Sequence, residues 1–114
     1  MTYYMKLQQE PFEKIACGIK TIELRLFDEK RRKIKMGDII IFTNIINPSR
    51  RICAKVIKLH RFDSFSELYR YLPLDKCGYT ADEILSADSK DMERYYSIEQ
   101  QEKYGVLGIE IKLI

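Results

Sequence analysis

Short runs of alternating or β-branched apolar residues recur along the chain and predict a sheet. We expect strands over residues 3–7, 21–26, 39–42, 51–62 and 106–114. The run at 51–62 is long enough to contain a bulge, and it should pair antiparallel with the strand before it, across a turn at 47–49.

The strand expected at 21–26 has two chemically different faces. Its sequence, TIELRL, alternates strictly, which places three apolar side chains on one face and Thr21, Glu23 and Arg25 on the other. We therefore expect one buried face and one face that carries polar chemistry.

Helices are expected between the strands. Pro11 suits the first turn of a helix that Gly18 ends. Capping-box spacings at Ser64 and Thr80 start two more helices, and S-x-x-Q at Ser97 lies in a further helical segment, so these hydroxyls are better explained as caps than as nucleophiles. Strands with short helices inserted between them predict an α+β fold with a small, mostly antiparallel, barrel-like sheet of about five or six strands.

Length and composition limit the chain to a single domain over residues 1–114. It has 114 residues, of which 46% are hydrophobic, enough to bury one core. No apolar run approaches the ~20 residues of a membrane span, and the first residues lack a signal segment, so we expect a cytoplasmic protein with no membrane partner. Three widely spaced cysteines and a single His leave little material for a disulfide framework or a metal site, and we expect no metal and no cofactor.

Charge is distributed unevenly along the chain. The formal net charge is +3, but residues 1–81 hold 16 Lys and Arg against 9 Asp and Glu, whereas residues 82–114 hold 4 against 8. Cations of the basic part could form the rim of a cleft and contact a nucleic-acid backbone. The candidate rim residues are Lys30, Arg31, Arg32, Lys33, Lys35, Arg50 and Arg51. The alternative is a solvated surface that binds nothing.

The main candidate site consists of Lys20, Glu23 and Arg25. Glu23 and Arg25 share a strand face and Lys20 stands at its entry, so the three can converge on one ligand. Arg and Lys can hold phosphate oxygens, while a carboxylate can accept hydrogen bonds from a base or ribose, or act as a general base. Between two cations, Glu23 should have a lowered pKa. The alternative is a structural Glu23–Arg25 ion pair with Lys20 in solvent.

Several other side chains have both a structural and a functional interpretation. Six tyrosines could stack on bases or pack in the core: Tyr69, Tyr71, Tyr79, Tyr95, Tyr96 and Tyr104. His60, the only histidine, is more simply a structural residue or a phosphate contact than a base. The three cysteines are most simply small apolar residues.

The run PFEKIACGIKTIELRL, followed by a Gly-Asp strand at 37–42, resembles the ASCH domain family. The motif of that family is G-x-K-x-x-E-x-R, and its positions are held by Gly18, Lys20, Glu23 and Arg25. The resemblance spans essentially the whole chain and implies a PUA-like β-barrel, with a cleft between barrel and helices that holds RNA or a nucleotide-like ligand. In some bacterial relatives it also implies chemistry, as an acetylcytidine amidohydrolase or a ribonuclease.

The chain departs from those amidohydrolases at the nucleophile. They have a Thr three residues after the motif Lys, where this chain has Glu23. Thr21 is expected on the same strand face but stands out of the family's register. The glutamate that completes the enzyme's set lies in its helical insertion, and Glu67 is the candidate here.

Three functions follow as hypotheses. The first is a module that binds RNA or a nucleotide over a floor of Lys20, Glu23 and Arg25. The second is a hydrolase of a modified nucleoside or of RNA, in which Lys20 activates a nucleophile or water and Glu23 is the base. The third is a domain whose basic face binds an acidic protein surface.

Overall fold

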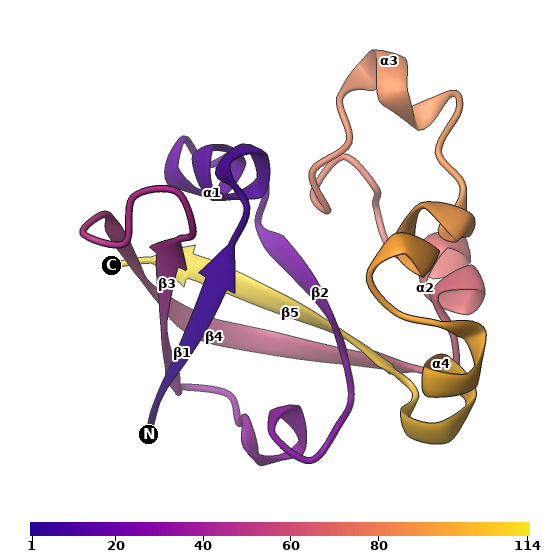
Figure 1. Cartoon of the computed structure of the whole chain (residues 1–114), viewed down its shortest axis with the longest axis horizontal. Helices are drawn as coiled ribbons and strands as arrows, with labels where there is room; N and C mark the ends of the chain where they lie inside the picture. Colours follow the sequence, from indigo (N-terminus) through magenta and orange to yellow (C-terminus); the bar gives the residue numbers. More distant parts are fainter.

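The computed structural model describes residues 1–114 and contains five strands, four α-helices and two 3-10 helices (Figure 1). The strands are β1 (Thr2–Leu7), β2 (Ile22–Leu26), β3 (Ile39–Asn44), β4 (Arg51–Phe62) and β5 (Val106–Leu113). The helices are α1 (Gln9–Ala16), η1 (Arg31–Lys33), α2 (Phe65–Tyr71), α3 (Ala81–Ile84), η2 (Ser89–Arg94) and α4 (Ile98–Tyr104). Every strand expected from the sequence is present, within two residues at each end.

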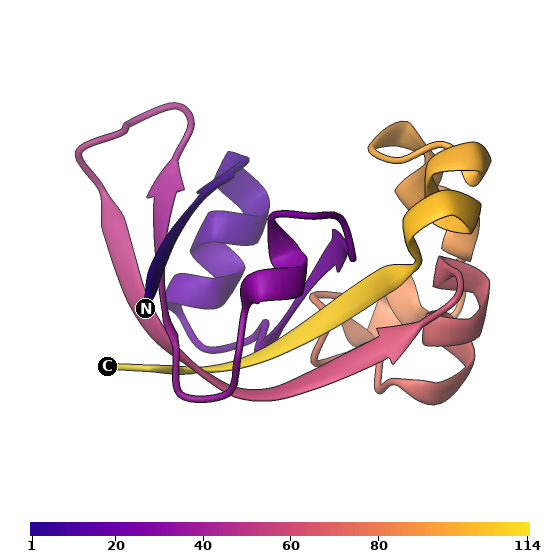
Figure 2. The same cartoon turned by 90° about the horizontal axis from the view of Figure 1, so that it is seen from below.

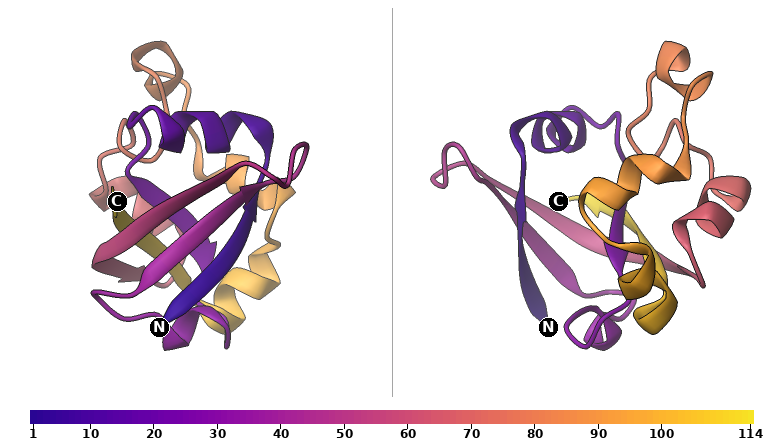
Figure 3. Two further views of the ribbon diagram at one scale, coloured as in Figure 1. Left: turned by 90° about the vertical axis from the view of Figure 1, so that its left-hand side faces the viewer. Right: turned by 45° about the vertical axis from the view of Figure 1, so that its right-hand side comes forward.

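All five strands belong to one sheet with the order β1-β3-β4-β5-β2. β1 runs parallel to β3, and the other three pairs are antiparallel. The sheet curls around its core (Figure 3), so the α+β prediction with a mostly antiparallel, PUA-like barrel is confirmed. β1 and β2 are the two ends of the sheet, and they do not pair with each other.

The long strand β4 connects the barrel to the helical part of the molecule. Together with β5 it forms an extended antiparallel ribbon that runs from one to the other (Figure 2). The expected pairing with β3 is confirmed, and the expected irregularity is a register shift between Val56 and Lys58. The shift bends the strand, as a bulge does.

The first hydrophobic core lies inside the barrel and is covered by α1. Phe12 and Ile15, three positions apart, lie on one face of this helix and are almost fully buried. They pack with side chains of four strands, among them Phe42 and Ile109. The helix therefore closes the core that β1, β3, β4 and β5 share.

A helical insertion, residues 63–105, lies between β4 and β5 and has its own core. Phe65 and Leu68 of α2 pack against the apolar face of β2. Ser64 and Thr80 accept hydrogen bonds from backbone N–H groups three residues on, so both are helix caps as expected, and Ser97 does the same for α4. No helix of the chain is both long and apolar enough to cross a membrane.

β2 has the predicted apolar face and polar face, and the structure buries both of them. Its apolar side chains contact the insertion, whereas Glu23 and Arg25 stand opposite Ile109 and Leu107 of β5 and so share the barrel's inner face. Glu23 is only 3% exposed. The alternation was predicted correctly, but the second layer that covers β2 comes from residues about 40 positions later in the chain.

Gly108 allows the insertion to approach the sheet closely. A Cβ at this position of β5 would lie 2.8 Å from Leu72 Cδ1 and 3.3 Å from Ile22 Cγ2. A larger residue there would require the Leu72 and Ile22 side chains to move.

The remaining residues singled out by sequence have simple surroundings. His60 Nε2 lies 2.9 Å from Glu110 Oε1 on the neighbouring strand, a structural pairing. All three cysteines are unpaired; Cys77 is buried as expected of an apolar residue, but Cys17 and Cys53 are exposed.

Candidate functional site

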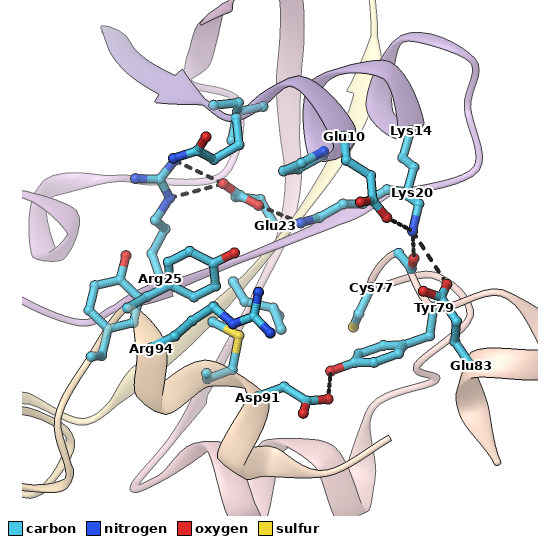
Figure 4. Close-up of a pocket in the computed structure, with 18 of the residues that line it drawn as sticks. Glu10, Lys14, Lys20, Glu23, Arg25, Cys77, Tyr79, Glu83, Asp91 and Arg94 are labelled. Carbon is cyan, nitrogen blue, oxygen red and sulfur yellow. Dashed lines mark hydrogen bonds and ion pairs between the residues drawn. The ribbon is translucent and has the colours of Figure 1, made fainter. Parts of the chain in front are cut away.

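A cavity lies along the seam where the two ends of the sheet face each other. It has a volume of about 580 Å³. Consecutive residues of both end strands line it, Lys6 and Leu7 from β1 and Glu23 to Arg25 from β2. β1 and β2 do not pair with each other, and helix α1 and the insertion form the other walls of the cavity between them (Figures 1 and 4).

The three residues of the sequence motif meet in this cavity as one ion cluster. Lys20 Nζ lies 2.8 Å from Glu23 Oε1, and the Arg25 guanidinium lies 2.9 Å from Glu23 Oε2 (Figure 4). The side chains of Lys20 and Arg25 are only 11% and 14% exposed. The structural alternative of a Glu23–Arg25 pair is present, but Lys20 joins it instead of extending into solvent.

The cluster keeps Glu23 ionised. Burial by itself would raise the pKa of this carboxyl, but the charges of Lys20 and Arg25 and their hydrogen bonds outweigh it and lower the pKa from 4.5 to about 2. At neutral pH Glu23 is therefore a hydrogen-bond acceptor and cannot donate a proton. The lowered pKa agrees with the sequence prediction.

Arg25 also joins the two ends of the sheet. Its Nη2 donates a hydrogen bond of 3.0 Å to the Lys6 carbonyl oxygen of β1. A side chain thus bridges the two edge strands where a backbone ladder is missing. The same guanidinium forms a wall of the cavity.

On the opposite side, Lys14 ties helix α1 to the insertion. Its Nζ donates to the Gly78 carbonyl at 2.6 Å and lies 3.0 Å from Glu10 and 3.4 Å from Glu83 (Figure 4). Burial lowers the pKa of Lys14, but the two carboxylates raise it by more, so the side chain stays charged. The charge of Lys14 is thus used within the protein.

Gly78 fits against Lys20 because it has no side chain. Its φ is +106°, a region that favours glycine, and a Cβ there would lie 3.2 Å from Lys20 Cδ. Lys76 accepts backbone hydrogen bonds from Thr21 and Ile22. The segment around Gly78 therefore positions the start of β2, and with it Lys20.

Two tyrosines and an aspartate form a hydrogen-bonded chain on the insertion side of the cavity. The hydroxyls of Tyr69 and Tyr79 are 2.6 Å apart, and Tyr79 donates to Asp91 Oδ2 at 2.8 Å. Burial raises the pKa of Tyr69 to about 12 and that of Cys77 to about 11, and the pKa of Tyr79 is raised further by burial and by its two partners. The hydroxyls and the thiol remain protonated at neutral pH, so they act as donors and not as nucleophiles.

The six candidate tyrosines separate into two groups. Those that line the cavity are Tyr69, Tyr79, Tyr95 and Tyr96. Tyr71 instead stacks on Phe62 with ring centroids 6.1 Å apart, and Tyr104 packs against the core of the insertion. Sequence spacing could not separate the groups, because all six lie in the same insertion.

Two cations of the cavity were missed by the sequence analysis. Lys6 and Arg94 line it and have no carboxylate within 4 Å (Figure 4 labels Arg94). Arg94 stacks over Tyr95, with its Cζ 5.8 Å from the ring centroid. Neither was among the candidate rim residues, and Arg94 lies in the acidic part of the chain, residues 82–114. The sequence carries no signal for either beyond its charge.

None of the candidate rim residues lines this cavity. Arg31 is paired with Asp28, and Arg32 lies over the ring of Phe27. Arg50 pairs with Glu13 and lies over Phe12. Lys35 and Arg51 are exposed elsewhere on the surface.

Lys30, Arg31 and Lys33 line a second hollow of about 540 Å³ on the other side of the Arg25–Lys6 bridge. It follows β1 toward its beginning, along Tyr3 to Lys6. Lys6 and Arg25 belong to the lining of both the cavity and the hollow.

The additional residues of the hydrolase hypothesis do not meet the cluster. Thr21 and Glu67 are absent from the lining of the cavity. No group of three or more His, Cys, Asp or Glu side chains is arranged to hold a metal ion.

The chain is similar to known proteins in sequence and in fold. The profile of the ASCH domain family matches residues 5–114. The crystal structure of the hypothetical protein PH0355 is 38% identical over the whole of both chains, with a TM-score of 0.83. The solution structure of protein PF0455 from Pyrococcus furiosus is 34% identical over the whole of this chain and 98% of that one, with a TM-score of 0.72.

A more distant match concerns the fold alone. The crystal structure of ASCH from Zymomonas mobilis is 13% identical, with a TM-score of 0.63, and the alignment covers 96% of this chain and 65% of that one. No curated protein matches the chain significantly.

Proposed function

Because the chain belongs to the ASCH domain family, we propose that it binds RNA or a nucleotide, with one nucleotide in the cavity beside Lys20, Glu23 and Arg25. A volume of about 580 Å³ lies within the ordinary range of small-molecule sites.

The observation that carries the proposal is the pair of unpaired cations next to aromatic rings. Lys6 and Arg94 have no carboxylate partner and are available to a phosphate. Lys14, Lys20 and Arg25, in contrast, are engaged with carboxylates of the protein. Tyr95 and Tyr96 line the same cavity. Arg94 lies over one face of Tyr95 and Phe65 stacks on one face of Tyr96, so a base can stack on the other face of either ring.

The motif cluster has a different role in this proposal. Glu23 stays ionised and is held at both oxygens, so it presents a fixed acceptor to a donor such as a base amino group or a ribose hydroxyl. Lys20 and Arg25 hold it in place and limit the net charge of the cavity. Five cations and four carboxylates line the cavity in total. A near-neutral lining suits one nucleotide better than a long stretch of backbone.

A thermal-shift experiment tests the proposal. The four common ribonucleosides and their 5′-monophosphates are added to the wild type, to Arg94→Ala and to the control Arg70→Ala, which removes an exposed cation of α2 outside the cavity. A ligand that binds only the folded state raises the apparent Tm. We expect at least one nucleotide to do so, and Arg94→Ala to weaken its binding about tenfold, the size of a lost charged hydrogen bond, while Arg70→Ala has no effect.

Two results would contradict the proposal. One is the absence of any shift with all monophosphates; the other is a shift of equal size in the wild type and Arg94→Ala, with binding that is also insensitive to Lys20→Ala.

The hydrolase hypothesis receives less support from the cavity. Its thiol and phenols are protonated, and the pKa of Glu23, lowered to about 2, makes this carboxylate a weak base, so the cavity lacks a ready nucleophile or base. Chromatography of acetylcytidine or RNA after incubation with the protein tests it directly. Turnover that disappears in Lys20→Ala would favour an enzyme.

A further inference from the structure

We propose that the hollow beside β1 is a second phosphate-binding subsite, and that the ligand is a single strand of RNA with one nucleotide in the cavity and the neighbouring phosphates in the hollow. The inference rests on the proposed function for the nucleotide in the cavity. It adds a second subsite beside the cavity, which favours a strand over a free nucleotide.

The charge of the hollow differs from that of the cavity. Five cations line it, and no carboxylate does: Lys6, Arg25, Lys30, Arg31 and Lys33. Arg25 and Arg31 are paired with carboxylates that lie outside the lining, whereas Lys6, Lys30 and Lys33 have no such partner within 4 Å. An excess of unpaired lysines is suited to consecutive phosphates, which need charge but no exact geometry.

The hollow and the cavity meet at the Arg25–Lys6 bridge. The guanidinium of Arg25 reaches across from β2 to β1, and both residues line the space on either side. The charged group of Lys6 is unpaired and common to both spaces. A strand that leaves the cavity can therefore cross the seam while keeping a cation beside its backbone.

The hollow also contains an exposed aromatic side chain. Tyr4 is 68% exposed, although it is a large aromatic residue on a strand. Tyr3 beside it is anchored, because its hydroxyl donates to the Lys33 carbonyl at 3.0 Å and so holds the 30–34 segment against β1. The hollow thus offers a stacking face together with its lysines, the combination used by proteins that bind single strands.

The test compares oligonucleotides with mononucleotides. Hexauridylate and hexaadenylate, with uridine and adenosine monophosphate, are titrated against the wild type and Lys30→Ala/Lys33→Ala. The control is Lys55→Ala/Lys58→Ala, which removes the same charge from exposed positions of β4 outside both spaces. Affinities are measured at several salt concentrations.

We expect Lys30→Ala/Lys33→Ala to weaken hexanucleotide binding about tenfold and to reduce its salt slope by about 1.4, the value for two lost contacts to a single strand. Mononucleotide binding should not change, and the control should change neither. A mononucleotide that fails to bind, with hexanucleotide binding still sensitive to Lys30 and Lys33, would contradict the proposed function but retain the second subsite.

Three results would overturn the inference. The first is an equal loss of hexanucleotide binding in the test and control variants, and the second is no hexanucleotide binding at all. The third is displacement of hexauridylate by hexaglutamate at equal concentration, which would identify an acidic peptide as the occupant.

Discussion

The cavity and the hollow are both rich in cations, but they use them differently. In the cavity, Lys14, Lys20 and Arg25 are bound to carboxylates and carbonyls of the protein. In the hollow, Lys30 and Lys33 have no ion-pair partner. The difference separates cations that stabilise the fold through ion pairs from cations that remain available to a ligand. Burial and pairing distinguish the two uses, and sequence does not.

The largest effect is expected from breaking the cluster in the cavity. Glu23→Ala leaves Lys20 and Arg25 largely buried without a counter-charge, which should lower the free energy of unfolding by about 3–5 kcal/mol. Urea unfolding measures the change. Glu29→Ala, an exposed carboxylate in the next loop, should stay within about 0.5 kcal/mol. A small loss in Glu23→Ala would mean that the two cations find other partners.

The second effect concerns the pH dependence of stability. The pKa of Glu23 is about 2 in the folded protein and near 4.5 when unfolded, so its contribution is complete above the unfolded pKa and is lost as the pH falls toward the folded one. A shift of this size corresponds to about 3 kcal/mol. Unfolding measured between pH 7 and pH 2.5 should therefore decline less steeply in Glu23→Gln than in the wild type. Parallel curves would contradict the lowered pKa.

A smaller effect is expected at Gly78, which positions Lys20. Gly78→Ala must adopt a positive φ and contact Lys20 Cδ, whereas the control Gly37→Ala has φ +93° with no atom within 4 Å of the new Cβ. Both should lose about 1–2 kcal/mol from backbone strain. Only Gly78→Ala should also weaken nucleotide binding. Equal binding in both variants would show that Lys20 does not depend on this contact.

A local effect is expected at Lys14. Its ion pairs are partly exposed, so Lys14→Ala should cost no more than about 1 kcal/mol of global stability. Because the side chain holds the Gly78 carbonyl, hydrogen exchange of the amides around residues 78–84 should accelerate. Lys90→Ala, which removes an exposed unpaired cation of η2, should leave that exchange unchanged.

The smallest effect on stability is expected in the hollow. Lys30→Ala/Lys33→Ala should change the free energy of unfolding by no more than about 0.5 kcal/mol, because neither side chain has an ion pair or hydrogen bond to lose. Thermal unfolding measures it. A large loss would mean that these lysines serve the fold, and the contrast between hollow and cavity would disappear.

The sequence by itself determined the elements and much of the motif cluster. Alternation predicted β2, and cap spacings predicted the starts of α2 and α3, since these signals act over two to four residues. The same local logic placed Glu23 between two cations, because Lys20 and Arg25 are near it in the chain. The lowered pKa of Glu23 followed from that proximity.

The tertiary structure alone decided which side chains meet across the chain. Lys6, Arg94 and the four cavity tyrosines come from β1 and from the insertion, and they converge only because the insertion packs against β2 while β1 belongs to the core that α1 covers. The sequence identified the rim lysines as part of a basic region. It could not show that Lys30 and Lys33 line the hollow on the other side of the Arg25–Lys6 bridge and not the cavity. Local patterns fix which face of a strand a residue occupies. Only packing between distant elements determines what that face meets.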